Sequence, residues 1–584
     1  MKSQLGIKIV FAILAAILFL PGLMNAQAPK MEYSTFLGGG GYDYGHSITV
    51  DDNGCAYIAG QVSSTNFPTT TGAYDRTANG SADIFVTKLN KEGSALIYST
   101  YIGGSAFDDT RNVCIDKSGC VYLTGSTSST NFPTTNGSLQ GSSSGYFLKL
   151  DSLGSNLIYS SRWNGGEKVL VDSKGYLIIM GNTNSATFPT TSNAYSRTLS
   201  GGNDIFVAKI DIKTNQILFS TLIGGAGDEW APNIVLDSQD NIIIAGQTSS
   251  ENFPTKGNTF GSYTAGKYNI FVTKLKSDGS QLLFSTIVGG TNDNWPWDVA
   301  IDLSENIYVT GGTSSTDFPV SASAFGKTYK GLHDAFLFKL KSDGSQLVYS
   351  SYFGGTDQDE ARGVAIDKNG RAYITGCTRS TNFPITTDAY DNSYNGGGTN
   401  QYAWGDPFLS VMNADGSQLE YSTYLGGSND EEAYGIAIDK QGSVYLSGVS
   451  TSSNYPTTAG AYDRSINGPC NVYVTKFSFN FQTDIKTENS VPQQFRLNQN
   501  YPNPFNPSTV ISYRLAVAVN VNLAVYNLLG QKIKTLVNSF QNAGEHSISW
   551  NATNNANSAV SSGIYFYYLE TGAMNLQKKM VLVR

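Results

Sequence analysis

Acidic and aromatic side chains gather in the short segments that follow a repeated Gly-Gly pair. Six such segments carry carboxylates, and two of them also carry tryptophans. Carboxylates can hold a cation or work in pairs as acid and base, and tryptophan offers a flat face on which a sugar ring packs. Together with Trp404 from a nearby insertion, the residues that we expect on one ligand-binding face are Trp230, Trp295, Trp297, Asp108, Asp109, Asp228, Glu229, Asp293, Asp359, Glu360, Asp430 and Glu431.

The insertion at 391–407 (DNSYNGGGTNQYAWGDP) interrupts one repeat and contains Trp404. Gly-rich and aromatic, it could fold over a ligand on the same face. Calcium is the one cofactor that this face suggests, because several carboxylates together could hold a Ca²⁺ that bridges to sugar hydroxyls. The alternative is structural. The acids would then cap turns and pair with lysines of neighbouring repeats, while the tryptophans and the insertion would fill a channel.

The sequence assigns no catalytic residue. It has three histidines, and HExxH, Walker and CxxC motifs are absent. Catalysis would need one or two acids that stand out from the repeat, whereas binding tolerates a ring of near-equivalent acids, which is the pattern here. We therefore expect a binding or adhesion module, with glycans as the ligand class. The alternatives are a glycan lyase or hydrolase on the same scaffold, and a purely structural surface protein.

The elements that must position these residues repeat seven times. The repeated phrase occurs as YSTFLGG at 33–39, YSTYIGG at 98–104, YSSRWNGG at 159–166, FSTLIGG at 219–225, FSTIVGG at 284–290, YSSYFGG at 349–355 and YSTYLGG at 421–427. A strand ending in Asp, a Gly turn, a strand such as VYLTG, a loop containing NFPTT and a strand such as IFVTKL follow each copy. Each repeat thus has four strands, and one of them is apolar on both sides, as in a sheet that is covered on both faces.

Stacking such sheets around an axis gives a propeller. We predict an all-β, seven-bladed β-propeller over residues 32–478. One outer strand lies alone at the N-terminal end, so residues 32–36 are expected to complete the blade that ends near Phe477. The phrases YST..GG, D..G..Y.TG and T.S.NFPTT resemble the bacterial SBBP-type β-propeller repeat family. That resemblance implies a fold and no single activity. One repeat departs from it, because Trp163-Asn164 replaces the usual aliphatic pair and the segment after Gly166 is shortened.

A composition change marks a second domain. Residues 479–494 are expected to be a linker, and 495–584 a small Ig-like β-sandwich with strands at 521–526, 531–536, 546–550, 564–569 and 578–583. The phrases NYPNPFNPST, VYNLLGQKI, GIYFYYLETG and the terminal KKMVLVR resemble the type A C-terminal sorting domain of the type IX secretion system. The resemblance implies contact with that machinery and export across the outer membrane. The alternative is an ordinary adhesive Ig-like module.

Residues 1–28 are expected to be a signal peptide, cleaved after Ala26 or Ala28. Lys2 and Lys8 precede a short apolar run, which is too short for a comfortable membrane anchor, the alternative. No other segment is expected to span a bilayer as a helix. The formal charge of −8 argues against nucleic acid as a partner. We expect a protein that passes through the periplasm and is secreted or displayed on the outer surface.

Overall fold

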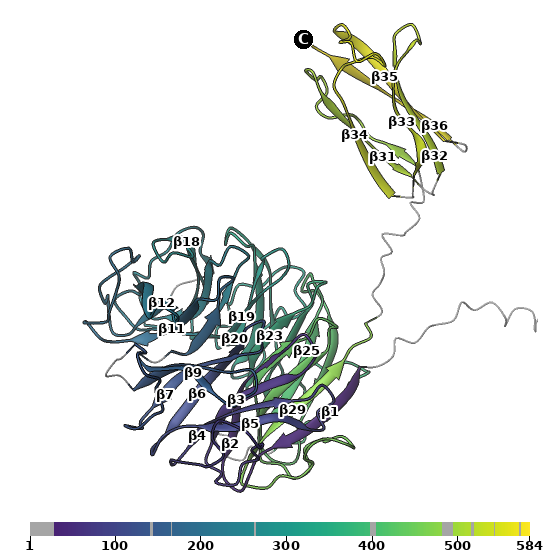
Figure 1. Cartoon of the computed structure of the whole chain (residues 1–584). Helices are drawn as coiled ribbons and strands as arrows, with labels where there is room; N and C mark the ends of the chain where they lie inside the picture. The colour runs from purple at the N-terminus through teal and green to yellow at the C-terminus, as the bar shows by residue number, and fades with distance from the viewer. Residues whose placement is uncertain are drawn as a thin grey trace, which may run out of the picture. The chain divides into compact units, whose positions relative to one another are not determined.

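The computed structural model describes residues 29–139, 144–164, 166–261, 264, 266–396, 405–481, 495–515, 519–541, 544–571 and 574–584. The expected signal peptide and Trp404 lie outside these residues. The chain forms two compact units, one spanning Ala28–Phe479 and one that includes Asn480–Arg584. The described parts of both units contain strands and no helix (Figure 1). The all-β class is confirmed.

Seven sheets build the described part of the first unit, and in six of them four antiparallel strands follow one another in chain order from the inside outward. The first three are β2 (Asp43–Val50), β3 (Ala56–Val62), β4 (Asp83–Leu89), β5 (Leu96–Ile102); β6 (Asp108–Ile115), β7 (Val121–Thr127), β8 (Gly145–Leu150), β9 (Leu157–Arg162); and β10 (Lys168–Val171), β11 (Leu177–Thr183), β12 (Asp204–Asp211), β13 (Gln216–Ile223). The next three are β14 (Glu229–Leu236), β15 (Ile242–Thr248), β17 (Asn269–Leu275), β18 (Leu282–Gly289), with a two-residue β16 (Phe260–Gly261); β19 (Asn294–Ile301), β20 (Ile307–Thr313), β21 (Asp334–Leu340), β22 (Leu347–Phe353); and β23 (Asp359–Ile366), β24 (Ala372–Thr378), β25 (Asp406–Met412), β26 (Leu419–Tyr424).

The last sheet joins the two ends of the unit. It consists of β27 (Glu431–Ile438), β28 (Val444–Ser450), β29 (Asn471–Ser478) and, on the outside, β1 (Lys30–Leu37). The register pairs Thr35 with Val474, and the hydroxyls of Ser34 and Thr475 are 2.8 Å apart. The expectation that residues 32–36 complete the blade ending near Phe477 is therefore confirmed. Such closure leaves few free edges, which is how a propeller avoids edge-to-edge pairing.

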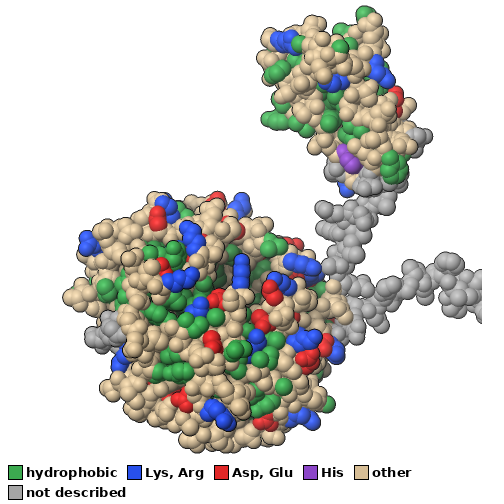
Figure 2. All heavy atoms as spheres, in the orientation of Figure 1, with side chains coloured by type: hydrophobic (Ala, Val, Ile, Leu, Met, Phe, Trp, Pro, Cys, Tyr) green, Lys and Arg blue, Asp and Glu red, His purple; other side chains and the backbone are tan. Residues whose placement is uncertain are grey.

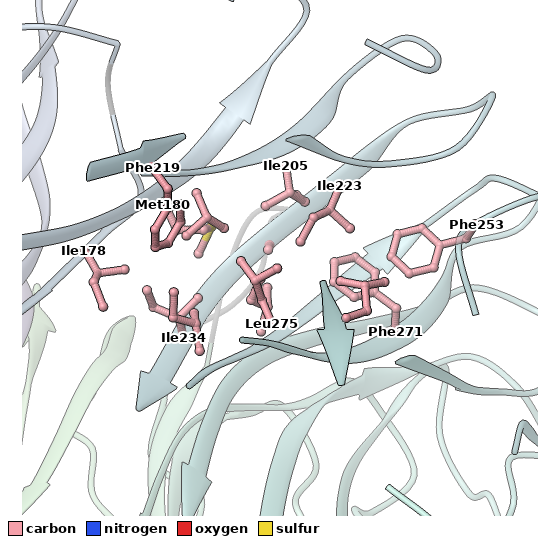
Figure 3. Close-up of a cluster of buried hydrophobic side chains, with 14 of the residues drawn as sticks. Ile178, Met180, Ile205, Phe219, Ile223, Ile234, Phe253, Phe271 and Leu275 are labelled. Atoms are coloured by element: carbon pink, nitrogen blue, oxygen red, sulfur yellow. The ribbon is translucent and has the colours of Figure 1, made fainter. Parts of the chain in front are cut away.

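Apolar side chains fill the spaces between neighbouring sheets. Between the third and fourth sheets, Met180 and Ile205 from one side pack in the same cluster as Ile234, Phe271 and Leu275 from the other (Figure 3). All five are at most 1% exposed. Each such side chain contributes roughly 1.5–3 kcal/mol by leaving water. The two-sided burial explains why these strands are apolar on both faces.

In six of the seven sheets, a buried or half-buried ion pair joins the turn after the inner strand to the third strand. In the fourth sheet, Asp237 accepts backbone hydrogen bonds from Gln239 and Asn241 at 2.9 and 2.8 Å, and its Oδ2 lies 2.6 Å from Lys274 Nζ. The equivalent pairs are Asp51–Lys88, Asp116–Lys149, Asp172–Lys209, Asp302–Lys339 and Asp439–Lys476. In the sixth sheet, Asp367 instead lies 3.5 Å from Arg371, which directly precedes the second strand. The repeated Asp, Gly-turn and Lys positions are thus explained by one contact.

The C-terminal unit is a sandwich of two sheets, in the orders β30-β31-β34 and β33-β32-β35-β36. The strands are β30 (Arg496–Leu497), β31 (Thr509–Leu515), β32 (Val519–Asn527), β33 (Lys532–Gln541), β34 (Gly544–Trp550), β35 (Gly563–Thr571) and β36 (Met574–Leu582). Trp550, Tyr567 and Leu523 are among its buried core side chains. The five expected strands are present. β30 and β31 were not expected, because the proline-rich segment at 500–509 hides the strand alternation that begins directly after it.

Candidate ligand-binding site

The inner strands begin earlier than the sequence indicates. Asp108 opens β6, Glu229 opens β14 and Asp359 opens β23, so these acids and the residues that follow them lie in strands and not in loops. From the sequence we expected these residues in the loops that connect one repeat to the next. That expectation was wrong because a β-bulge interrupts the pairing, for example between Trp230 and Asn233, and masks the alternation. Successive side chains on a strand point to opposite faces, so the acids divide into groups with different surroundings.

The first residue of an inner strand holds the Gly-Gly turn. Asp108 is 0% exposed and accepts hydrogen bonds from Gly104 N at 2.6 Å and Ser129 Oγ at 2.8 Å, with a further one from Thr127 Oγ1. Glu229, Asp359 and Glu431 make the equivalent contacts. These four carboxylates are used by the fold and do not face a ligand. The structural alternative applies to them because turn N–H and hydroxyl donors occupy their oxygens.

Three predicted acids lie in the loops between sheets. Asp228 Oδ1 accepts a hydrogen bond from Asn203 N at 2.9 Å, and Asp293 Oδ2 is 3.0 Å from Lys267 Nζ. Asp430 lies in the equivalent loop, where its backbone oxygen accepts a hydrogen bond from Thr451 N at 3.1 Å. These contacts attach the loops to neighbouring strands. Asp228, Asp293 and Asp430 therefore belong to the rim, away from the residues that converge on the axis.

The residues that converge on the axis line a central channel. A cavity of about 490 Å³ is lined by residues from all seven inner strands. One representative from each strand, in chain order, is His46, Arg111, Lys168, Trp230, Trp297, Arg362 and Tyr434. The charged and aromatic residues at which the repeats differ from one another thus meet around one axis. Trp230 and Trp297 are the two predicted residues that line this cavity directly.

Aromatic and cationic groups stack along one side of the channel. The rings of Trp230 and Trp297 meet edge to face, with centroids 5.4 Å apart. The Arg362 guanidinium lies 5.1 Å from the centre of the Trp297 ring, within cation–π range. Rings held in this way present a rigid apolar surface beside polar groups, which suits a sugar ring.

Arg362 joins three sheets. Its Nε lies 3.0 Å from Glu360 Oε2, and its Nη1 lies 3.0 Å from Glu432 Oε1. Trp295 Nε1 donates a hydrogen bond of 2.6 Å to the other oxygen of Glu360, and the Tyr434 hydroxyl donates to Glu432. Burial alone would raise the pKa of Glu360, but Arg362 and the indole donor hold it below its usual value. Glu360 is therefore a paired carboxylate at neutral pH.

A second ion-pair group continues the ring. Asp109 Oδ1 lies 3.2 Å from His46 Nδ1, and Asp109 Oδ2 accepts a hydrogen bond of 3.0 Å from Arg111 Nε. The His46 ring is 5.2 Å from the Tyr434 ring, which links this group to the Arg362 group. Although burial disfavours its charge, His46 and Arg111 keep the pKa of Asp109 below its usual value. A continuous series of contacts therefore runs from Trp230 round to Arg111.

The series is interrupted at β10. The Lys168 ammonium group makes no hydrogen bond or ion pair within the described part of the chain, and burial lowers its pKa. Burial also raises the pKa of the neighbouring Glu167. β10 has four residues where the other inner strands have eight, so the inner wall of the channel is built from the shortest strand on this side.

The described residues contain no group of three or more His, Cys, Asp or Glu side chains placed to hold a metal ion. Nor do they contain a helix of the length and apolarity that crossing a membrane requires. On the face shown in Figure 2, acidic and basic side chains of the propeller unit are interspersed.

Sequence reasoning missed several channel residues. Arg362, Tyr434, His46 and Lys168 are absent from the predicted set, although they contact or neighbour its members. Arg362 and Tyr434 each lie two residues after an acid on an inner strand. That spacing, applied to every repeat, was the signal that could have found them.

Comparisons with known proteins bear on fold and export. The profile of the SBBP β-propeller repeat matches residues 32–68, 97–133, 348–384 and 420–456, and that of the secretion system C-terminal sorting domain matches residues 499–583. A search of curated proteins found no match.

Solved structures with some similarity include a Dyadobacter fermentans protein of unknown function (10% identity, covering 78% of this chain and 100% of that one, TM-score 0.38). Others are PorZ of the Porphyromonas gingivalis type IX secretion system (12%, 92% and 74%, TM-score 0.18) and an ulvan lyase bound to a GlcA–Rha3S unit (9%, 72% and 92%, TM-score 0.37). Likeness at this level supports no argument about activity.

The sorting domain implies interaction with the type IX secretion machinery and indicates export to the extracellular space or the cell surface. The chain is therefore a secreted β-propeller protein that carries SBBP-type repeats and a C-terminal type IX sorting domain.

Proposed function

We propose that the propeller binds extracellular or surface polysaccharide at the central channel. The observation that carries this proposal is the convergence of the Trp230–Trp297 pair with charged and hydroxyl groups in one cavity. Sugars offer apolar C–H faces and hydroxyl groups, so a site that combines rigid indoles with polar donors and acceptors complements them.

The channel carboxylates favour binding over catalysis. The carboxylates of Asp109, Glu360 and Glu432 each lie 3.0 Å from an arginine nitrogen. Glycoside hydrolysis needs one carboxyl that is free to donate a proton and a second that attacks or activates water. Carboxylates committed to ion pairs serve better to hold the channel walls and to accept sugar hydroxyls. If the propeller only binds glycans, adhesion is the biological role that follows. A glycan lyase or hydrolase remains the alternative function.

The test is a glycan array with the purified propeller, with and without calcium, followed by calorimetry on the best ligand. Trp230→Ala is expected to weaken binding at least tenfold while the melting temperature stays nearly unchanged. Leu303→Ala is the matched control, because Leu303 is 84% exposed at the far end of the β19 hairpin. Unchanged affinity in Trp230→Ala would move the site elsewhere. New reducing ends or unsaturated sugars in the reaction would favour the enzyme.

A further inference from the structure

A second cavity lies beside the channel, at the third sheet. It has a volume of about 430 Å³ and shares Arg111 and Glu167 with the channel lining. We call it the third-sheet notch. Its remaining lining is polar or glycine: Gly125, Ser126, Ser144, Gly145, Asn164, Gly166, Asn182, Thr183, Asn184, Ser185 and Asn203. In each of the six other sheets, a protein side chain occupies the position that corresponds to this notch.

In those six sheets, the first inner-strand residue fills the corresponding position. It is Asp43, Asp108, Glu229, Asn294, Asp359 or Glu431. In the second sheet, Thr127 Oγ1 and Ser129 Oγ both donate to the Asp108 carboxylate, and Ser129 N donates to Thr127 Oγ1 at 3.0 Å. The hydroxyl pair is thus built to hold a carboxylate. A backbone N–H of the Gly-Gly turn adds a third donor.

The third sheet keeps the hydroxyl pair and lacks the carboxylate. Ser185 N donates to Thr183 Oγ1 at 3.2 Å, as in the second sheet, but the inner strand begins only at Lys168. Within the described part of the chain, the Thr183 hydroxyl has no acceptor. In the first sheet, Asp83 opens the third strand and lies beside the inner strand of the next sheet. In the second sheet, Gly145 stands at this position, so no carboxylate from the third strand lies beside the notch.

Two further observations point to a ligand. Asn182 lines the notch, and its Oδ1 is buried without a hydrogen-bond partner among the described residues. The Arg111 side chain is 62% exposed and uses Nε for Asp109, and no described residue bonds its terminal nitrogens. A buried amide oxygen without a donor is costly, and the exposed end of a guanidinium can form charge-assisted hydrogen bonds with a carboxylate.

We infer that the third-sheet notch binds the carboxylate of a uronic acid residue in a glycan chain. The carboxylate takes the place that Asp108 has in the second sheet, accepting from Thr183 and Ser185 and facing the charge of Arg111. The inference rests on the proposed function, since Arg111 and Glu167 border both cavities and one glycan can extend from the channel into the notch. The Asn and Ser lining suits sugar hydroxyls and offers no apolar pocket for a peptide side chain.

The experiment compares hexagalacturonate with its methyl ester by calorimetry on the purified full chain. For the wild type, esterification is expected to weaken binding at least tenfold, because a charge-assisted contact is lost. Thr183→Val with Ser185→Ala is expected to weaken binding of the acid about tenfold and to leave the affinity for the ester unchanged. Thr214→Val is the matched control, on an exposed turn at the other end of the same sheet.

The outcomes separate the two proposals. Equal affinity of the wild type for acid and ester, or full affinity of the double variant for the acid, would overturn the notch inference. Binding of uronic-acid glycans that depends on Trp230 but not on Thr183 and Ser185 would overturn it too, while leaving the proposed function in place. Absence of binding to every glycan on the array would overturn both.

Discussion

Asn471 Nδ2 donates a hydrogen bond of 3.2 Å to Asp43 Oδ2 across the closing junction of the propeller. Its Oδ1 accepts from Asn467 N at 2.6 Å, so the amide satisfies both sides. At the preceding junction the same two positions hold acids, Asp406 and Glu431. There Asp406 Oδ2 accepts from Asn395 N, but Oδ1 has no partner among the described residues.

Stability is therefore expected to fall as the pH rises from about 4 towards neutrality. Burial, reinforced by the charge of Glu431, raises the pKa of Asp406 to about 7, and burial likewise raises that of Asp359 to about 7. A carboxyl whose pKa is higher in the folded state than in the unfolded state stabilises the fold while it is protonated. That contribution is lost between about pH 4 and pH 7. The melting temperature, measured by scanning fluorimetry, should fall from pH 5 to pH 8.

Asp406→Asn is expected to reduce this pH dependence and to raise the melting temperature at pH 8. The new amide can donate to Glu431 as Asn471 donates to Asp43. Asp388→Asn, at an exposed position in the same sheet's loop, is the matched control and should change neither quantity. An Asp406→Asn protein that kept the full pH slope would show that the acid pair does not cause it.

Asp237→Ala is expected to lower the free energy of unfolding by about 3 kcal/mol, because it leaves the Lys274 ammonium buried without its partner. The two side chains are only 1% and 10% exposed. Asp278→Ala removes an equally short ion pair with Lys276 at a similar turn, but both groups there are more than 40% exposed. The control should cost less than about 1 kcal/mol. Urea unfolding measures both, and equal losses would contradict the assignment.

Deleting residues 31–37 is expected to lower the melting temperature strongly or to prevent folding, because β29 would lose its outer partner along its whole length. A chain beginning at Lys30 keeps β1 and serves as the control. Full thermal stability in the deletion would mean that the propeller closes without β1.

A chain ending at residue 481 is expected to fold with the melting temperature of the full propeller and to remain in the periplasm. The propeller unit ends at Phe479, and the sorting domain has its own core. Immunoblots of periplasm and medium, beside the full chain, provide the measurement. Normal export of the shortened chain would show that sorting information lies elsewhere.

Much of the fold could be predicted because each repeat solves the same packing problem, and because β1 and β29 share the strand phrases of the other sheets. The site could be predicted only in part. Arg362 pairs with Glu360 two residues away and with Glu432 seventy residues away, and the second contact depends on the angle between sheets. No single repeat contains that information. The signal peptide and the place of Trp404 stay predictions.

The closure of the ring also determines the order in which the propeller can fold. Ser34 and Thr475 are 441 residues apart in the sequence, so β1 can pair only after β29, the last strand of the propeller, has been synthesised. Contacts between such distant residues slow folding, and an unpaired strand edge attracts other chains meanwhile. When such a chain crosses a membrane with its N-terminus first, β1 thus stays unpaired until nearly the whole propeller has crossed. The yield of folded protein then depends on how long this strand edge is kept from pairing with other chains.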